Sequence, residues 1–199
     1  HIDPIVVAQK AIPGLFNEIT TTEIDNYLAE TAASLTVEHP DYSNLAARIK
    51  ANALHKETPG FIIATKNLYD DGLLRKDYYE KIINNSDVIE SIIDYDRDYH
   101  FDYFALTTLT RAYLLKFKNM TVERPQDLWM RVALTVASNE FDYNKVKNTY
   151  SALSNGMYTH ATPTLFNSGL KMQQLSSCFL IGMEDDSIEG IFNTIKDCA

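Results

Sequence analysis

The chain has 199 residues, of which 45% are hydrophobic and 23% are charged, values that are ordinary for a globular protein with a sizeable core. Its formal net charge of -9 at pH 7 disfavours nonspecific binding to nucleic acid or to anionic membranes. The sequence has neither an apolar run of about eighteen residues nor a basic and then apolar amino terminus, so we expect no membrane span and no secretory signal.

Cysteine usage indicates a reducing compartment. Cys178 and Cys198 are too few for a disulfide-stapled secreted fold, so a cytoplasmic location fits better. The five histidines are scattered and no Cys-x-x-Cys occurs, so we expect no metal site. The chain runs directly into residues 2–7, which read as mid-domain, and closes at Ala199 inside an unfinished helical pattern, which predicts a piece of a longer polypeptide.

Helical patterns dominate the first part of the chain. Thr20 followed by Glu23 is a capping-box signal and predicts a helix over residues 22–36. A second helix is expected to open at Asp41, because apolar residues follow it at helical spacing. A third is expected near residues 76–84, after an Asp-Asp-Gly turn.

The middle of the chain mixes a connection, a hairpin and two further helices. Residues 95–99 are polar and aromatic, which predicts a connection with partly buried rings. Residues 112–122 predict a small hairpin with a turn near Asn119. Pro125 and Asp142 are each expected to open a helix. The apolar faces predicted for these two helices are Leu128, Trp129, Val132, Ala133 and Val136, and Tyr143, Val146, Tyr150 and Leu153.

After residue 155 the spacing of the apolar residues is no longer helical. Two short extended segments are expected at residues 158–165 and 174–182. A helix should then begin at Asp185 or Asp186, with Asp186 and Glu189 as a capping pair. Its predicted buried stripe is Ile188, Ile191, Phe192 and Ile195. The pattern therefore predicts a mainly α chain that ends in the first strands and helix of an α/β barrel.

Several motifs, in shared order and spacing, carry a family resemblance over nearly the whole chain. They are residues 20–33, 39–49, 95–98, 111–116, 123–126, 159–169, 174–180 and 185–191. These stretches resemble the large (alpha) subunit of class I ribonucleotide reductase. The resemblance implies that residues 1–56 are the carboxy-terminal part of an ATP cone, that residues 57–156 are a helical domain with a small hairpin, and that residues 157–199 begin a ten-stranded catalytic α/β barrel.

By resemblance, Cys178 is one of two active-site cysteines that are oxidised to a disulfide while the ribose 2'-hydroxyl is removed, and thiol exchange would reset it. Residue type alone favours a buried small hydrophobe instead. Cys198 is expected to pack in the core. Thr162 and Ser177 resemble substrate-contacting positions. Strand alternation would point Ser177 and Cys178 to opposite faces, so both serve one site only if the strand bulges or one contact is through backbone.

The resemblance also places nucleotide effectors at the last predicted helix. Asp186, Ser187 and Ile188 match the specificity site, where an effector selects which base is reduced. Free N–H groups and the positive dipole end at a helix start favour a phosphate there. An ordinary helix cap is the alternative interpretation, and both roles can coexist.

A second effector site is implied near the amino terminus. Thr21, Asp25 and Lys56 match the overall activity site of the ATP cone, and Lys56 could offer a point charge to a phosphate. The basic, glycine-containing segment with which the family's cone begins is absent from this sequence. A solvated helix face is the alternative for Asp25.

The resemblance implies reduction of ribonucleoside diphosphates to deoxyribonucleoside diphosphates by thiyl-radical chemistry, under control of ATP and dNTP effectors. The fragment itself is expected to bind no cofactor and to be inactive alone. The expected partners are a small subunit with a dinuclear metal-radical centre, a thioredoxin or glutaredoxin type reductant, and a second copy of the large subunit. Two alternatives stay open: a noncatalytic nucleotide-sensing or assembly module, and a cobalamin-dependent (class II) reductase.

Overall fold

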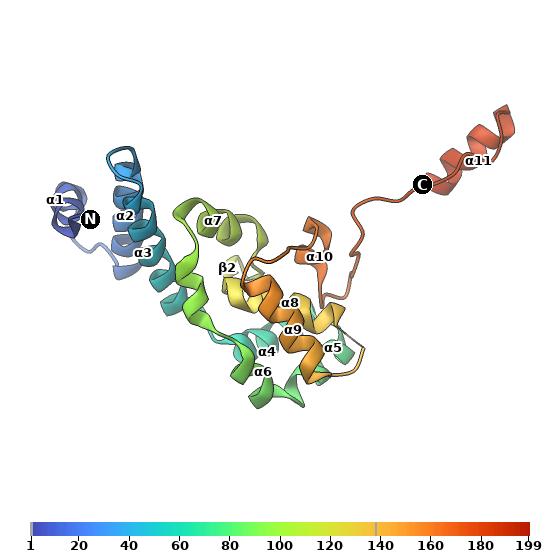
Figure 1. Cartoon of the computed structure of the whole chain (residues 1–199), viewed down its shortest axis with the longest axis horizontal. Coiled ribbons are helices and arrows are strands. Elements are labelled where there is room, and N and C mark those ends of the chain that lie inside the picture. Colours follow the sequence, from blue (N-terminus) through green and yellow to red (C-terminus); the bar gives the residue numbers. More distant parts are fainter. Residues whose placement is uncertain (1, 138) are drawn as a thin grey trace.

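The computed structural model describes residues 2–137 and 139–199 and consists mostly of helices (Figure 1). The α-helices are α1 (Pro4–Ala11), α2 (Thr21–Ser34), α3 (Asp41–Glu57), α4 (Phe61–Asp70), α5 (Lys76–Ile83), α6 (Ser86–Ile92), α7 (Tyr103–Thr108), α8 (Pro125–Val136), α9 (Tyr143–Ser154), α10 (Thr162–Asn167) and α11 (Ile188–Cys198). Other helical turns are η1 (Ile12–Gly14), η2 (Leu35–Val37), η3 (Tyr95–His100) and the wider η4 (Leu109–Tyr113). A hairpin joins β1 (Lys116–Phe117) to β2 (Met120–Thr121). The predicted mainly α class is confirmed.

The amino-terminal helices form a layer at one end of the molecule, where α2 packs against both α1 and α3 (Figure 1). The predicted capping box is confirmed, because the Thr20 N–H donates to Glu23 Oε2 at 2.9 Å and the Glu23 N–H donates to Thr20 Oγ1 at 3.2 Å. The helix predicted over residues 22–36 is α2, and the one expected from Asp41 is α3. Together with α1 and η2 they enclose a small core, which consists of Val7, Ala32, Leu35, Tyr42 and Ala46.

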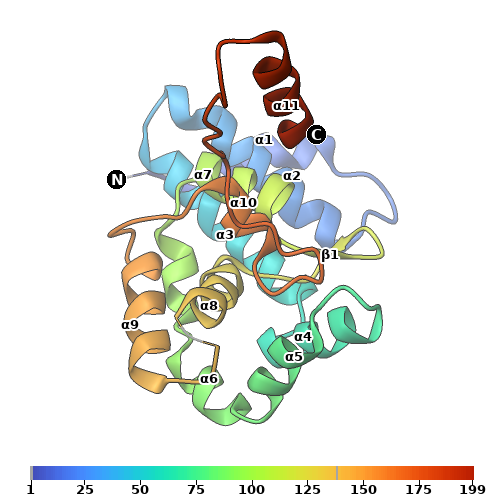
Figure 2. The same cartoon turned by 90° about the vertical axis from the view of Figure 1, so that its right-hand side faces the viewer.

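Helix α8 lies at the centre of the larger core. Residues 125–134 are all buried, and Figure 2 shows α8 between α9 and the α4–α5 pair. This helix carries Leu128, Met130 and Leu134 among the least exposed side chains of the molecule. Since little of α8 is exposed to solvent, the other elements of this core pack around it.

The helices predicted near residues 76–84, from Pro125 and from Asp142 are confirmed as α5, α8 and α9. Asp142 caps α9 as expected, with its Oδ1 accepting from the Lys145 N–H at 3.1 Å. The predicted apolar faces are buried with two exceptions. Val136 and Tyr143 are 38% and 41% exposed, because each lies at an end of its helix, where neighbouring elements no longer cover it.

The predicted hairpin and the polar connection before it are also present. Lys116 pairs with Thr121 in the antiparallel register. Lys118 and Asn119 turn the chain with positive φ angles of 48° and 67°, so the turn lies where it was expected. The hairpin is shorter than predicted, because the chain before β1 coils into η4. Residues 95–99 lie in the turn η3, and the rings of Tyr95 and Tyr99 are half-buried.

The extended segments predicted after residue 155 are wrong in part. Residues 162–167 form α10 instead of a strand, because Pro163 lies in its first turn, a position that proline favours. Residues 174–182 are not helical, but within the described part of the chain no strand pairs with them. A single bridge, between Leu74 and Leu170, is formed nearby. A barrel strand needs neighbours on both sides, so the expected start of a barrel stays a prediction.

The last helix departs from its prediction in three respects. It begins at Ile188, and Ser187 rather than Asp186 is its cap, with Oγ accepting from the Gly190 N–H at 3.1 Å. Its apolar stripe is exposed, since α11 stands away from the body at the end of an extended run (Figure 1). Cys198 is exposed as well, so its expected place in a core is wrong.

Candidate functional site

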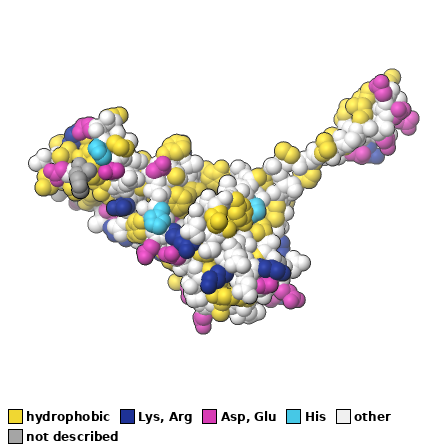
Figure 3. Space-filling view, in the orientation of Figure 1, with side chains coloured by type: hydrophobic (Ala, Val, Ile, Leu, Met, Phe, Trp, Pro, Cys, Tyr) yellow, Lys and Arg dark blue, Asp and Glu magenta, His cyan; other side chains and the backbone are white. Residues whose placement is uncertain are grey.

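Cys178 lies on the run that joins α10 to α11. Its thiol-bearing side chain is exposed, and the chain bends at the preceding Ser177. The bend removes the conflict expected from strand alternation, because both residues line one open cavity of about 540 Å³. Figure 3 shows hydrophobic side chains along this run. The residues that line the cavity are Ser177, Cys178, Phe179, Leu180, Ile181, Asp197 and Cys198.

Thr162 begins α10 and is exposed. Its Oγ1 lies 3.5 Å from the Tyr113 hydroxyl, and the Tyr113 ring packs on Phe166 with centroids 4.9 Å apart. Thr162 therefore faces η4, whereas Ser177 and Cys178 line their cavity with the residues that follow them. The structure brings Ser177 and Cys178 together and keeps Thr162 in a separate contact.

The chain between α10 and Cys178 is held against the body. Thr164 Oγ1 donates to the Leu175 carbonyl at 3.0 Å, and Asn167 Nδ2 donates to the Gln174 carbonyl at 2.7 Å. Gly169 has a φ of 77°, and a Cβ on it would lie 2.7 Å from the buried Tyr78 ring. Only glycine fits there without displacing that ring.

The residues predicted for the specificity site surround the start of α11. Asp186 and Ile188 are exposed, Ile188 by 77%, and Ser187 acts as the cap. The buried Gly190 has no room for a side chain, because a Cβ would lie 2.5 Å from the Asp185 carbonyl oxygen. The capping interpretation of Ser187 is therefore present in the structure, while effector binding stays a prediction.

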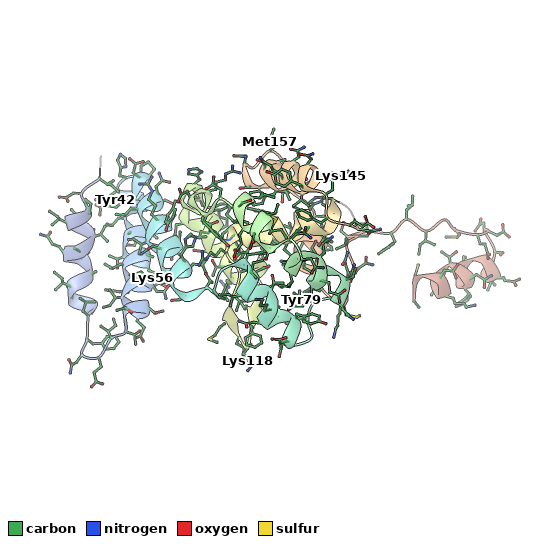
Figure 4. All side chains as sticks on the ribbon, turned by 90° about the horizontal axis from the view of Figure 1, so that it is seen from below. Tyr42, Lys56, Tyr79, Lys118, Lys145 and Met157 are labelled. Atoms are coloured by element: carbon green, nitrogen blue, oxygen red, sulfur yellow. The ribbon has the colours of Figure 1, made fainter. Side chains whose placement is uncertain are left out.

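Two of the residues predicted for the activity site form an ion pair. Lys56 Nζ lies 2.7 Å from Asp25 Oδ2, and the Asp25 side chain is 19% exposed. Figure 4 shows Lys56 near the junction between the amino-terminal helices and the larger core. Thr21 lies one turn before Asp25 on α2. A cavity of about 430 Å³ lies between α2, α3, η4 and the hairpin, lined by Thr22, Asn26, Lys50, Ala53, Leu54, Glu57, Thr110, Asn119, Met120 and Thr121.

Sequence reasoning missed a buried polar network that joins α3, η3, α8 and α9. Asp98 has no exposed surface, and its Oδ2 lies 2.7 Å from His55 Nε2. Gln126 Nε2 donates to Asp98 Oδ1 at 3.1 Å, and Gln126 Oε1 accepts from the Tyr150 hydroxyl at 2.9 Å. The stretches 95–98 and 123–126 each combine acidic and basic residues, and this clustering of opposite charges is the signal that could have revealed the network.

Asp127 forms a second buried cluster at the start of α8. Its Oδ1 accepts from the Tyr95 hydroxyl at 2.7 Å, and its Oδ2 accepts from the Arg124 N–H at 2.8 Å. Burial raises the pKa of Asp127 to about 7, although both hydrogen bonds act in the opposite direction. Desolvation, together with the neighbouring Asp127 carboxylate, also raises the pKa of Tyr95. The cluster contributes to structure, since it caps a helix inside the core.

The described residues offer little for metal binding. Across residues 2–137 and 139–199, no three or more His, Cys, Asp and Glu side chains gather in a way that could hold a metal ion. Over the same residues, no helix has the length and apolar character needed to cross a bilayer.

Comparison with known proteins decides the family. The chain is 46% identical over its whole length to a ribonucleoside-diphosphate reductase large subunit from Arabidopsis thaliana, and 45% identical to those from Dictyostelium discoideum and variola virus. The chain belongs to the ribonucleotide reductase large-subunit family. A family model described as "Ribonucleotide reductase, all-alpha domain" matches residues 99–173. The chain spans about a quarter of the length of these curated relatives, since it covers 25%, 24% and 27% of them.

The family match bears on the alternatives left open by the sequence. The relatives named above are all called reductase large subunits, so the noncatalytic sensing module gains no support. The all-alpha domain match begins near the end of η3 and includes α7, η4, the hairpin, α8, α9 and α10. Helices α1 to α6 and α11 lie outside that match.

Proposed function

We propose that this chain is part of the large subunit of a ribonucleoside-diphosphate reductase, which converts ribonucleoside diphosphates to deoxyribonucleoside diphosphates by thiyl-radical chemistry. The observation that carries the proposal is the 46% identity, over the whole chain, to a protein named as that large subunit. The substrate class and the reaction come from that name and from the resemblance of the motifs around Cys178.

Cys178 is proposed as one of the two thiols that supply reducing equivalents. Two thiols together give two electrons and two protons, the ribose 2'-hydroxyl leaves as water, and the two sulfur atoms become a disulfide. A dithiol of the thioredoxin or glutaredoxin type then reduces that disulfide by exchange. Exposure of Cys178 beside an open cavity supports this role, because both a sugar and an external dithiol must reach the sulfur.

Substrate binding is assigned to two hydroxyl residues near this cysteine. Ser177 shares the cavity with Cys178, and Thr162 exposes its side chain at the start of α10. A hydroxyl can donate to a diphosphate oxygen or accept from a ribose hydroxyl, so either residue suits the substrate's polar groups. Ser177 has the stronger structural support, because it lines the same cavity as the reacting sulfur.

Nucleotide effectors are proposed at two further places. Asp186, Ser187 and Ile188 would form part of the specificity site at the start of α11. The exposed Asp186 carboxylate can accept from a sugar hydroxyl there. At the other end of the chain, Asp25 and Lys56 with the nearby Thr21 would form part of the overall activity site.

The proposed assembly follows from the family. A radical-generating small subunit with a dinuclear metal centre would start the reaction, and two large subunits would pair. The complete enzyme would work in the cytoplasm. The present chain would supply one redox cysteine and effector contacts, and alone it would not turn over substrate.

The test replaces Cys178 with Ser in the full-length protein and measures CDP reduction with the small subunit and dithiothreitol. Turnover is expected to be lost, because a hydroxyl cannot form the disulfide. Cys198→Ser is the matched control, since it removes the other exposed thiol of the same cavity, and it should keep the parent rate. Full turnover by Cys178→Ser would remove this cysteine from the mechanism.

A further inference from the structure

A buried ion pair in the larger core contacts α10, the helix that precedes the segment carrying Cys178. Arg131 on α8 and Glu123 are each 2% exposed. Arg131 Nε donates to Glu123 Oε1 at 2.5 Å, and Arg131 Nη2 donates to Glu123 Oε2 at 3.2 Å. Burying two charges is costly, and a stable pair needs further hydrogen bonds that satisfy the remaining donors and acceptors. The further hydrogen bonds of Arg131 and Glu123 identify the segments of the chain that this ion pair holds in place.

Both charged groups reach other segments of the chain. Arg131 Nη1 donates to the Ser168 carbonyl at 2.9 Å, and Nη2 donates to the Leu165 carbonyl at 3.0 Å. Glu123 Oε2 accepts from the Leu115 N–H at 2.8 Å. The two carbonyls belong to the last turn and the cap of α10, where a helix leaves its acceptors unpaired. The planar guanidinium fork suits such a pair of acceptors.

Helix α10 depends on this contact, and the chain toward Cys178 depends on α10. The helix has six residues, too few to be stable alone, and it lies against α8 (Figure 1). Its side chains Thr164 and Asn167 hold the carbonyls of Leu175 and Gln174. Arg131 is therefore linked to the residues that immediately precede Ser177 through two successive sets of hydrogen bonds.

The hydrogen bonds from Thr164 and Asn167 anchor the chain at Gln174 and Leu175, and this anchor limits how far Cys178 can move. Leu175 is three residues before Cys178, a span of at most about 10 Å of extended chain. Without the α10 contacts, the next anchor is the hydrogen bond that Arg75 Nη1 donates to Gln173 Oε1, five residues before Cys178. A span of that length allows roughly 17 Å. The anchor at Leu175 therefore shortens the reach of the thiol by about 40%.

We propose that Arg131 and Glu123 are positioning residues for the reductase, which fix α10 and the following turn and so set where the Cys178 thiol stands. The proposal rests on the proposed function of Cys178. Neither residue touches substrate. Because displacing a reacting group by about 1 Å can reduce a rate by about 10²-fold, loss of the anchor should lower turnover strongly.

The test uses Arg131→Lys in the full-length protein with its small subunit. Lysine keeps the charge beside Glu123 but cannot bridge two carbonyls in one plane. The expected result is a kcat for CDP reduction at least roughly tenfold lower, with a much smaller change in KM, because substrate binding precedes the thiol step. Amide hydrogen exchange should also become faster across residues 165–178.

Tyr150→Phe is the matched control for general destabilisation. It removes a buried hydroxyl of the other polar network in the same core and touches neither α10 nor the turn after it. It should lower the thermal midpoint yet keep kcat and the exchange pattern of residues 165–178. If Arg131→Lys fails to fold, the pair Arg131→Met with Glu123→Leu removes both charges together, a change that cores often tolerate. The same loss of kcat and of protection is expected from it.

Two results would overturn the proposal: a folded Arg131 variant with the parent kcat, or a slow variant whose amides in residues 165–178 stay protected. If Cys178 has no redox role, the result is different, because Cys178→Ser would then turn over at the parent rate. In that case the hydrogen-exchange measurement alone decides whether Arg131 and Glu123 fix residues 165–178. Unchanged protection of those residues in the Arg131 variant would show that the ion pair does not anchor them.

Discussion

Asp127 is a carboxylate inside the core whose pKa is raised to about 7 by burial. A group whose pKa is higher in the folded state stabilises the fold in its protonated form. That contribution is complete below the ordinary value of 3.8 and is lost as the pH rises to about 7. Each unit of difference corresponds to about 1.4 kcal/mol.

We therefore predict that Asp127→Asn flattens the pH dependence of stability. The free energy of unfolding of the parent chain should fall between pH 5 and pH 8 relative to this variant, as measured by urea denaturation at both values. Asp142→Asn is the control, because the Lys145 N–H holds the pKa of Asp142 below its usual range. Asp142 stays ionised from pH 5 to pH 8, so its replacement should not change the slope. Parallel curves for the parent and Asp127→Asn would contradict the prediction.

At the scale of elements, the turn after α10 depends on one glycine. Gly169 has a φ of 77° and lies against Tyr78. Gly169→Ala should cost about 1–2 kcal/mol for the left-handed backbone and more for the overlap with the ring. Gly156→Ala is the matched control, since Gly156 has a φ of 68° and open space around it. The thermal unfolding midpoint of Gly169→Ala should lie clearly below that of Gly156→Ala. Equal midpoints would show that the contact with the Tyr78 ring adds no cost.

Local signals predicted the starts of α2 and α9 well, while contacts between distant segments could not be predicted. The Thr20 capping box and the Asp142 cap involve residues within a few positions, so the sequence contains all that determines them. The segment at 158–165 was predicted as extended because its apolar spacing is ambiguous over so short a run. Its helical state depends on Arg131, which lies more than thirty residues earlier in the chain.

The candidate site was predictable in its residue types and less so in its geometry. The motif around Cys178 identified the cysteine, and the structure places it beside an open cavity. The bend at Ser177 had no sequence signal beyond the conflict with strand alternation. The buried charges of α8 were missed because periodicity assigns charged residues to a solvent face. That helix has almost no such face, so Arg131 and Asp127 lie inside.

At the scale of the whole molecule, burial divides the chain into a packed body and the α11 arm. Leu134 has no exposed surface and lies in the larger core, whereas Phe192 on α11 is 66% exposed. For this chain, Leu134→Ala should cost about 2–5 kcal/mol, and Phe192→Ser should change stability by less than about 0.5 kcal/mol. Chemical denaturation of both variants checks the contrast. A large loss in Phe192→Ser would show that α11 packs on the body in solution.

Neighbouring residues of α3 form bonds on two sides of one helical turn. Lys56 pairs with Asp25 in the amino-terminal layer, and His55 pairs with Asp98 in the larger core. A rotation of α3 about its axis would move both side chains away from their carboxylate partners. The end of α3 therefore connects the amino-terminal layer to the larger core. A movement of one part relative to the other must either move both together with α3 or break one of these two contacts.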